Sequence, residues 1–142
     1  MRFAYPSYRA SLIRPTVHPC RNKPASLRAA FKRHDGRMCI SSITDMELVY
    51  GAEGSMNPER NLTRLEGIVA RMAVLPLDES AAVHAGQIRA ELAKQGTPIG
   101  PYDQLIAGHA RSQGLVLVTN NEKEFSRVAG LRVENWVPPS SS

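Results

Sequence analysis

Leu115-Val116-Leu117-Val118 is an unbroken apolar run that directly follows Gly114. A strand with one face in water alternates apolar and polar residues, whereas consecutive apolar residues are typical of a strand that is buried on both faces. Such strands occur in parallel sheets, because the crossover helices of a parallel sheet cover both of its faces. The run therefore predicts an α/β fold with helices on both sides of the sheet.

The chain from Pro24 onward alternates helix and strand signals, as this fold requires. We expect strands over residues 38–42, 73–77, 115–118 and 131–133, helices over 24–34, 44–54, 58–72, 78–95 and 102–113, and a helical turn over 122–128. Thr44 and Asp78 are suited to helix N-caps, and Gly96 and Gly114 to helix ends. Residues 1–21 show no stable period of 2 or 3.6, so we assign no element to them.

Length, charge and cysteine content narrow the class of protein. The 142 residues, 42% of them hydrophobic, are enough for one domain with a core. The net charge of +5 favours a polyanionic partner such as nucleic acid, although a solvated surface gives the same count. Cys20 and Cys39 show no metal-binding or disulfide spacing. Without an apolar run long enough for a membrane span or a signal peptide, we expect a cytoplasmic protein that does not enter the membrane.

Acidic residues fall at positions that a parallel sheet brings to one edge. Glu47 follows the strand over residues 38–42, in what we expect to be the first turn of a helix, and Glu124 follows the strand over 115–118. Asp103 begins a helix behind a Gly-Pro-Tyr loop. Carboxylates gathered at such an edge, without His or Cys, suit Mg²⁺ or Mn²⁺, which can activate a water against a phosphodiester. Taken singly, each acid is also explained by the helix dipole.

Other chemistries have less support. His84 and His109 lie within helices without a second histidine at metal-binding spacing, and we expect each to be a packed or solvated helix residue. Ser41 and Ser42 have no histidine and acid at a spacing that suggests a catalytic triad. Tyr102 either stacks on a base or wedges its loop against the core. The glycine motifs that cradle nucleotides do not occur.

Three segments of the chain match a known set of motifs. Residues 39–52 read CISSITDMELVYGA, residues 100–111 read GPYDQLIAGHAR, and residues 117–125 read LVTNNEKEF. In this order they resemble the segments that carry the second, third and fourth acids of VapC-type PIN-domain ribonucleases, which are toxins of type II toxin–antitoxin systems. Residues 22–26 and 130–136 extend the resemblance over most of the chain.

The resemblance implies a fold and partners. It implies a PIN-like three-layer α/β/α domain over residues 22–136 with a mostly parallel central sheet, preceded by a non-matching segment over 1–21 and followed by a disordered tail over 137–142. It also implies a Mg²⁺-dependent endoribonuclease, with Mn²⁺ as the other candidate ion. The implied partners are a second copy of the chain in a homodimer, a VapB-type antitoxin that holds the toxin inactive, and an RNA substrate, with initiator tRNA the first to test.

The resemblance also implies roles for single residues. Glu47, Asp103 and Glu124 would be the catalytic, metal-binding acids. Asn121 stands where other branches of the family have an aspartate, and it would either bind the metal through water or orient the backbone. Thr119 would support the same loop by hydrogen bonding.

The amino-terminal segment departs from the family. Its members open with an apolar strand that ends in Asp-Thr-Asn, and this aspartate is a principal metal ligand. By family spacing it would fall near Leu12, but no acid precedes Asp35. The first strand is therefore unassigned, and its loss would remove one metal ligand and uncover an edge of the strand over residues 115–118. The alternatives to an active enzyme are an inactive PIN-fold protein that only binds antitoxin or RNA, and a disrupted product that folds poorly.

A shifted reading frame would account for the missing aspartate. If the codon of Leu12 ends in G, that base and the first two of Ile13 spell an aspartate codon. An ATA codon for Ile13 followed by a CG-type codon for Arg14 then supplies the threonine. The coding DNA tests this hypothesis, because absence of that out-of-frame Asp-Thr rules it out. A degenerate allele or a sequencing error would also leave the aspartate missing.

Overall fold

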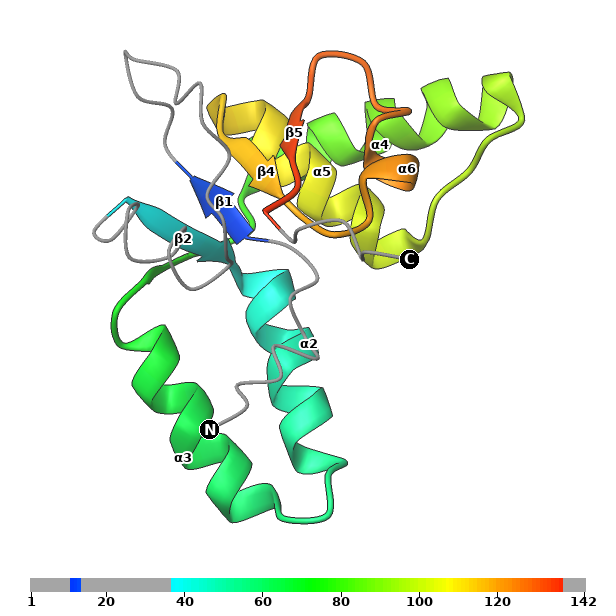
Figure 1. Ribbon diagram of the computed structural model, residues 1–142. Coiled ribbons are helices and arrows are strands. Elements are labelled where there is room, and N and C mark those ends of the chain that lie inside the picture. The colour runs from blue at the N-terminus through cyan, green and yellow to red at the C-terminus, as the bar shows by residue number, and fades with distance from the viewer. Residues whose placement is uncertain (1–10, 14–36, 137–142) are drawn as a thin grey trace.

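The computed structural model describes residues 11–13 and 37–136. These residues form one five-stranded sheet in the order β3-β2-β1-β4-β5 (Figure 1). The strands are β1 (Ser11–Ile13), β2 (Met38–Ser41), β3 (Ala73–Leu75), β4 (Val116–Val118) and β5 (Arg132–Glu134). The helices are α2 (Ser42–Glu53), α3 (Pro58–Val69), α4 (Glu79–Gln95), α5 (Pro101–Gln113) and α6 (Glu122–Phe125).

The direction of the strands confirms a mostly parallel sheet and corrects the expectation for its centre. β2 and β3 are parallel, as are β4 and β5, while β1 runs antiparallel to both of its neighbours, β2 and β4. Leu12 pairs with Cys39 on one side and with Leu117 on the other. The expected uncovered edge of β4 is therefore wrong. So is the absence of any element from residues 1–21, because a strand of three residues is set by its neighbours and is too short to show a period.

The start of α2 differs from the expected one. Ser41 is the N-cap, and its Oγ accepts a hydrogen bond from the Ile43 N–H at 3.2 Å. Thr44, the predicted cap, is buried inside the helix. Because the helix begins three residues earlier than the cap at Thr44 implied, Glu47 lies in its second turn and not in the first. A serine at the end of a buried strand caps as well as a threonine does, and the sequence offers both.

Other predicted boundaries are confirmed. Asp78 caps α4 through a hydrogen bond from the Ala81 N–H to its Oδ1 at 2.9 Å. Gly96 and Gly114 end α4 and α5 with φ values of +70° and +64°, which favour glycine. The predicted helix over residues 24–34 and the predicted tail over 137–142 lie outside the described residues.

The main apolar core lies between the sheet and the pair formed by α4 and α5. Figure 1 shows this pair beside β4 and β5, with α2 and α3 extending as a second pair from the side of the sheet that carries β2. Core side chains that are at most 1% exposed include Ile88, Leu92, Ile106, Leu117 and Phe125. By contrast, α3 has no buried residue. Within the described part of the chain, no helix has the length and apolar character needed to cross a membrane.

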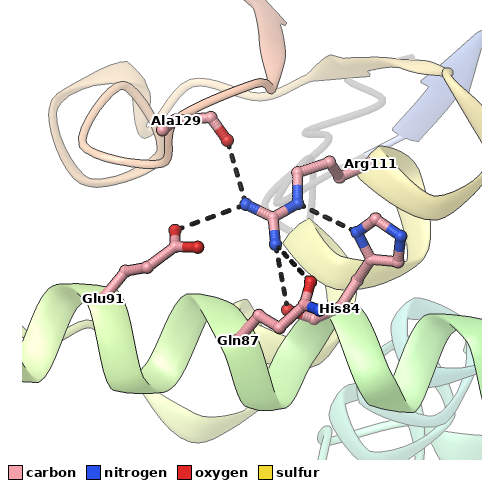
Figure 2. A network of polar contacts seen from close by, with 5 residues as sticks. All are labelled: His84, Gln87, Glu91, Arg111 and Ala129. Carbon is pink, nitrogen blue, oxygen red and sulfur yellow. Dashed lines mark hydrogen bonds and ion pairs between the residues drawn. The ribbon is translucent and has the colours of Figure 1, made fainter.

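Arg111 ties three parts of the fold together (Figure 2). From α5 its Nε donates to His84 Nδ1 of α4 at 3.0 Å, and one terminal nitrogen donates to the carbonyl of Ala129, in the turn before β5, also at 3.0 Å. Further bonds reach Gln87 Oε1 at 3.2 Å and Glu91 Oε2 at 3.4 Å on α4. His84, predicted to be packed or solvated, is half-buried and accepts the Arg111 bond. The guanidinium therefore holds α4, α5 and the approach to β5 in one arrangement.

Candidate active site

The carboxyl ends of β2 and β4 lie on either side of the central strand and define the edge where a site is expected. Ser41 ends β2 and Thr119 follows β4, and both are fully buried. Thr119 donates its N–H to the Glu134 carbonyl at 2.9 Å, and its Oγ1 accepts from the Asn121 N–H at 3.0 Å. The predicted supporting role of Thr119 is thus confirmed.

The loop after β4 presents Glu124. Asn121 donates from Nδ2 to Glu124 Oε2 at 3.1 Å, and both side chains are half-buried. A neutral amide from the same short loop therefore orients the carboxylate without neutralising its charge. This contact is with the Glu124 side chain, so the two predicted roles of Asn121, binding a metal through water and orienting the backbone, stay predictions.

Asp103 and Glu47 are half-buried acids on two different helices. Asp103 lies in the first turn of α5, where the N-cap Gly100 provides no side chain. A Cβ built on Gly100 would lie 3.6 Å from Asp103 Oδ2, so a larger residue at this position would contact the carboxylate. Gln104 Nε2 donates to the Ile99 carbonyl at 3.1 Å and anchors the loop behind the aspartate.

The fit of these residues to a divalent cation is partial. Their oxygen donors are of the kind that Mg²⁺ and Mn²⁺ prefer. However, in residues 11–13 and 37–136 no group of three or more His, Cys, Asp or Glu side chains is arranged so that it could hold a metal ion. The metal-binding roles of Glu47, Asp103, Glu124 and Asn121 therefore stay predictions.

The central strand β1 runs antiparallel to both of its neighbours. In its antiparallel register Leu12 lies in the middle of the ladder, and Ser11 lies opposite Val118 at the carboxyl end of β4. Ile13, the last residue of β1, lies opposite Val116 at the amino end of β4. Leu12, near which the first family acid is expected, therefore does not lie at the carboxyl edge of β2 and β4.

Disulfide cross-linking tests whether β1 runs antiparallel to β4. Residues opposite each other on antiparallel strands have Cα atoms about 5 Å apart, which suits a disulfide. With Cys20 and Cys39 replaced by Ser and Ala, we expect the pair Ser11→Cys and Val118→Cys to cross-link on mild oxidation, measured by thiol titration. A parallel strand would instead bring position 13 to Val118. Preferential cross-linking of Ile13→Cys with Val118→Cys would contradict the antiparallel register.

One buried contact was missed by the sequence analysis. His109 Nδ1 lies 2.8 Å from Ser41 Oγ, and both residues are 0% exposed. Sequence spacing gave no sign of this contact, because the two partners are 68 residues apart along the chain. Burial lowers the pKa of His109 from 6.5, and the nearby charge of Asp78 partly opposes this shift. A hydroxyl with no exposed surface cannot meet a substrate, so the contact is not a nucleophilic pair.

Tyr102, at the start of α5, is 50% exposed. Half of the residue is covered and half is accessible, so both predicted roles, wedging the loop against the core and stacking on a base, stay predictions.

Comparison with known proteins identifies the family. The model of the PIN domain matches residues 17–131. The chain belongs to the PIN domain family. It is 64% identical over 120 residues to the tRNA(fMet)-specific endonuclease VapC of Shigella flexneri, covering 84% of this chain and 91% of that protein. It is 48% identical over 121 residues to Ribonuclease VapC2 of Haemophilus influenzae, covering 85% and 92%.

Solved structures agree with this family. The crystal structure of DNA-bound VapBC from Salmonella typhimurium contains a chain that is 62% identical, with a TM-score of 0.76, and the match covers 81% of this chain and 87% of that one. VapBC2 from Rickettsia felis gives a TM-score of 0.67 at 40% identity, covering 69% and 74%. The predicted VapC-type PIN fold is thereby confirmed.

Proposed function

We propose that this chain is an endoribonuclease toxin of a VapC-type toxin–antitoxin system and that its substrate is tRNA. The observation that carries the proposal is the 64% identity to a tRNA(fMet)-specific endonuclease over 91% of that protein. The fold supports it, because acids on α2, α5 and α6 lie within the family motifs, and Thr119 and Asn121 make hydrogen bonds that hold the approach to α6 and orient Glu124. Initiator tRNA is accordingly the proposed RNA.

The proposal assigns a role to each acid. Glu47 and Asp103 would hold a Mg²⁺ ion, for which Mn²⁺ can substitute, and Glu124 would be the further acid. Such an ion, when bound, supplies an activated water and neutralises charge on the phosphodiester. Because the acids are half-buried, water screens their charge less than it would on a fully exposed surface, and they stay accessible.

The proposed protein partner is a VapB-type antitoxin. The structures similar to this chain from Salmonella typhimurium and Rickettsia felis are VapBC complexes. A second copy of the chain is the other proposed partner, as the family resemblance implies. Size-exclusion chromatography with light scattering measures the homodimer on the purified chain, and the antitoxin complex on the chain mixed with a VapB-type antitoxin.

A second function is favoured by the structure of the first strand. The chain has no acid before Asp35, and β1 runs antiparallel to β2 and β4. A PIN-fold protein with an incomplete acid set can bind antitoxin or RNA without cutting RNA. In this second candidate the PIN fold is present, but the protein does not cleave RNA.

Cleavage of an initiator tRNA anticodon stem-loop separates the two candidates. We expect cleavage that needs added Mg²⁺ and stops with chelator, and Glu47→Gln to lower kcat/KM at least about 100-fold because it removes a metal-binding charge. Asp45→Asn, two residues earlier on α2, is the matched control and should cleave at the wild-type rate. Cleavage in the presence of chelator, or equal loss in both variants, would contradict the site. Binding without cleavage by the wild type would establish the second function.

A further inference from the structure

The hydrogen bond between Ser41 and His109 has no access to water on either side. Burying two polar side chains costs free energy unless they pair, whereas two apolar side chains would fill the same space without that cost. Networks of this kind contribute by fixing which elements meet, and much less by adding net stability. Ser41 also stabilises α2 as its N-cap, so what stability leaves unexplained is the choice of a buried histidine as its partner.

The second ring nitrogen of His109 also indicates that stability alone does not favour a histidine here. This Nε2 atom is buried and makes no hydrogen bond within the described residues. Oγ1 of Thr44, in the first turn of α2, is likewise buried and makes no hydrogen bond within the described residues. An unpaired buried polar atom costs about 1–3 kcal/mol. A leucine at position 109 would remove that cost, so the histidine is not the choice that stability alone favours.

The bond joins the two helices that carry proposed active-site acids. Ser41 is the N-cap of α2, which bears Glu47, and His109 lies on α5, which bears Asp103. Because the side chains of helical residues move with their helix, the contact between Ser41 and His109 constrains how far apart the two carboxylates can lie.

α5 is fixed from another side by the residue next to His109. A Cβ on Gly108 would meet the N atom of Ala85 at 2.5 Å and the carbonyl oxygen of Ala81 at 2.8 Å, so the backbones of α4 and α5 are in direct contact there. Neighbouring residues of α5 thus touch α4 on one side and the start of α2 on another. The helix cannot shift along its axis without breaking one of these contacts.

We propose that the Ser41–His109 hydrogen bond is a latch that sets the separation of Glu47 and Asp103, and that His109 is thereby a positioning residue for the cleavage reaction. The latch rests on the proposed function for its effect on catalysis but not for its effect on geometry. Because neither latch residue is exposed, neither contacts RNA. Loss of the latch should therefore lower kcat and leave KM unchanged, since small misplacements of reacting groups are costly.

The geometric effect can be measured without activity. Glu47→Cys and Asp103→Cys are combined in a Cys20→Ser background, in which Cys39 is buried, and the rate of joining by a short bifunctional thiol reagent is recorded. We expect His109→Leu to change this rate at least about threefold. His109→Asn, whose amide can still bond Ser41, should restore it. Equal rates in the latch-intact and His109→Leu proteins would overturn the latch, whether or not the wild type cleaves RNA.

The catalytic effect uses the same two substitutions in the otherwise native chain. We expect His109→Leu to lower kcat about tenfold or more with KM unchanged, and His109→Asn to recover most of it. Val116→Ala, at the amino end of β4, is the control for general destabilisation. At temperatures well below the Tm of this variant, its kcat should equal that of the wild type. An active wild type whose kcat is unaffected by His109→Leu would overturn the positioning role. An inactive wild type would overturn the proposed function, and the cross-linking rates would then decide the latch.

Acid titration gives an independent signature of His109. Burial lowers the pKa of this histidine in the folded protein, so the unfolded chain takes up the proton first as the pH falls below 6.5. The wild type should therefore lose stability to urea as the pH falls through this range. In His109→Asn the free energy of unfolding should fall less over this pH range, because the variant has no histidine to protonate. An identical pH dependence in both proteins would contradict a buried, neutral His109.

Discussion

Gly108→Ala is expected to destabilise the protein by about 3 kcal/mol or to prevent folding. The new Cβ would lie 2.5 Å from the N atom of Ala85 and 2.7 Å from its Cα, and both are backbone atoms that no side-chain rotation can move. The higher helix propensity of alanine contributes only about 1 kcal/mol in the opposite direction. Urea unfolding followed by circular dichroism measures the difference.

Gly86→Ala is the matched control for this substitution. Gly86 lies on the exposed face of α4, and a Cβ there would meet nothing within 4 Å. Alanine should therefore stabilise the protein by about 0.5–1 kcal/mol, because it restricts the unfolded chain. Equal effects of the two substitutions would show that α4 and α5 do not pack with their backbones in contact.

Arg111→Met is expected to cost about 2–4 kcal/mol. The arginine side chain is only 13% exposed, and its removal leaves the Ala129 carbonyl and His84 Nδ1 without their donor. The partner Glu91 is 45% exposed, so its ion pair adds little. Urea unfolding gives the total loss, and faster amide hydrogen exchange in the turn before β5 would locate it.

Two further variants show which contacts of Arg111 matter. Arg111→Lys should recover only part of the stability, since one ammonium group cannot span α4 and the Ala129 turn at once. Glu91→Gln should change stability by less than about 0.5 kcal/mol. A loss with Glu91→Gln as large as that with Arg111→Met would mean that the ion pair, and not the buried bonds, holds the three segments.

Local signals were enough to predict most elements from Met38 onward. Asp78 acts through its side chain on a backbone N–H three residues away, and the glycines at 96 and 114 act through their own backbones, so their local sequence context carries the information. The start of α2 was predicted three residues late because Ser41 and Thr44 are both suited to capping, and only packing decides between them. β1 had no local signal at all.

The residues of the candidate site also differ in whether the sequence alone could indicate them. Glu47, Asp103 and Glu124 could be assigned as candidates because the motifs around them are contiguous in sequence. His109 was not assigned to the site, because its partner Ser41 is distant along the chain and an isolated helical histidine has many roles. Whether the acids act with a metal ion depends on distances that no local pattern sets.

The unbroken apolar run at residues 115–118 was the most constraining feature of the sequence, and by itself it determined that this chain builds a sheet covered on both faces. Residues 116–118 of the run form β4, and all four residues of the run are buried as expected. Tertiary structure alone decided that the strand beside it enters in the reverse direction, because strand direction is set by which backbone ladders are available and not by hydrophobicity. It also decided that α5 is held between the backbone of α4 and the cap of α2, because close approach and buried pairing exist only once distant segments meet.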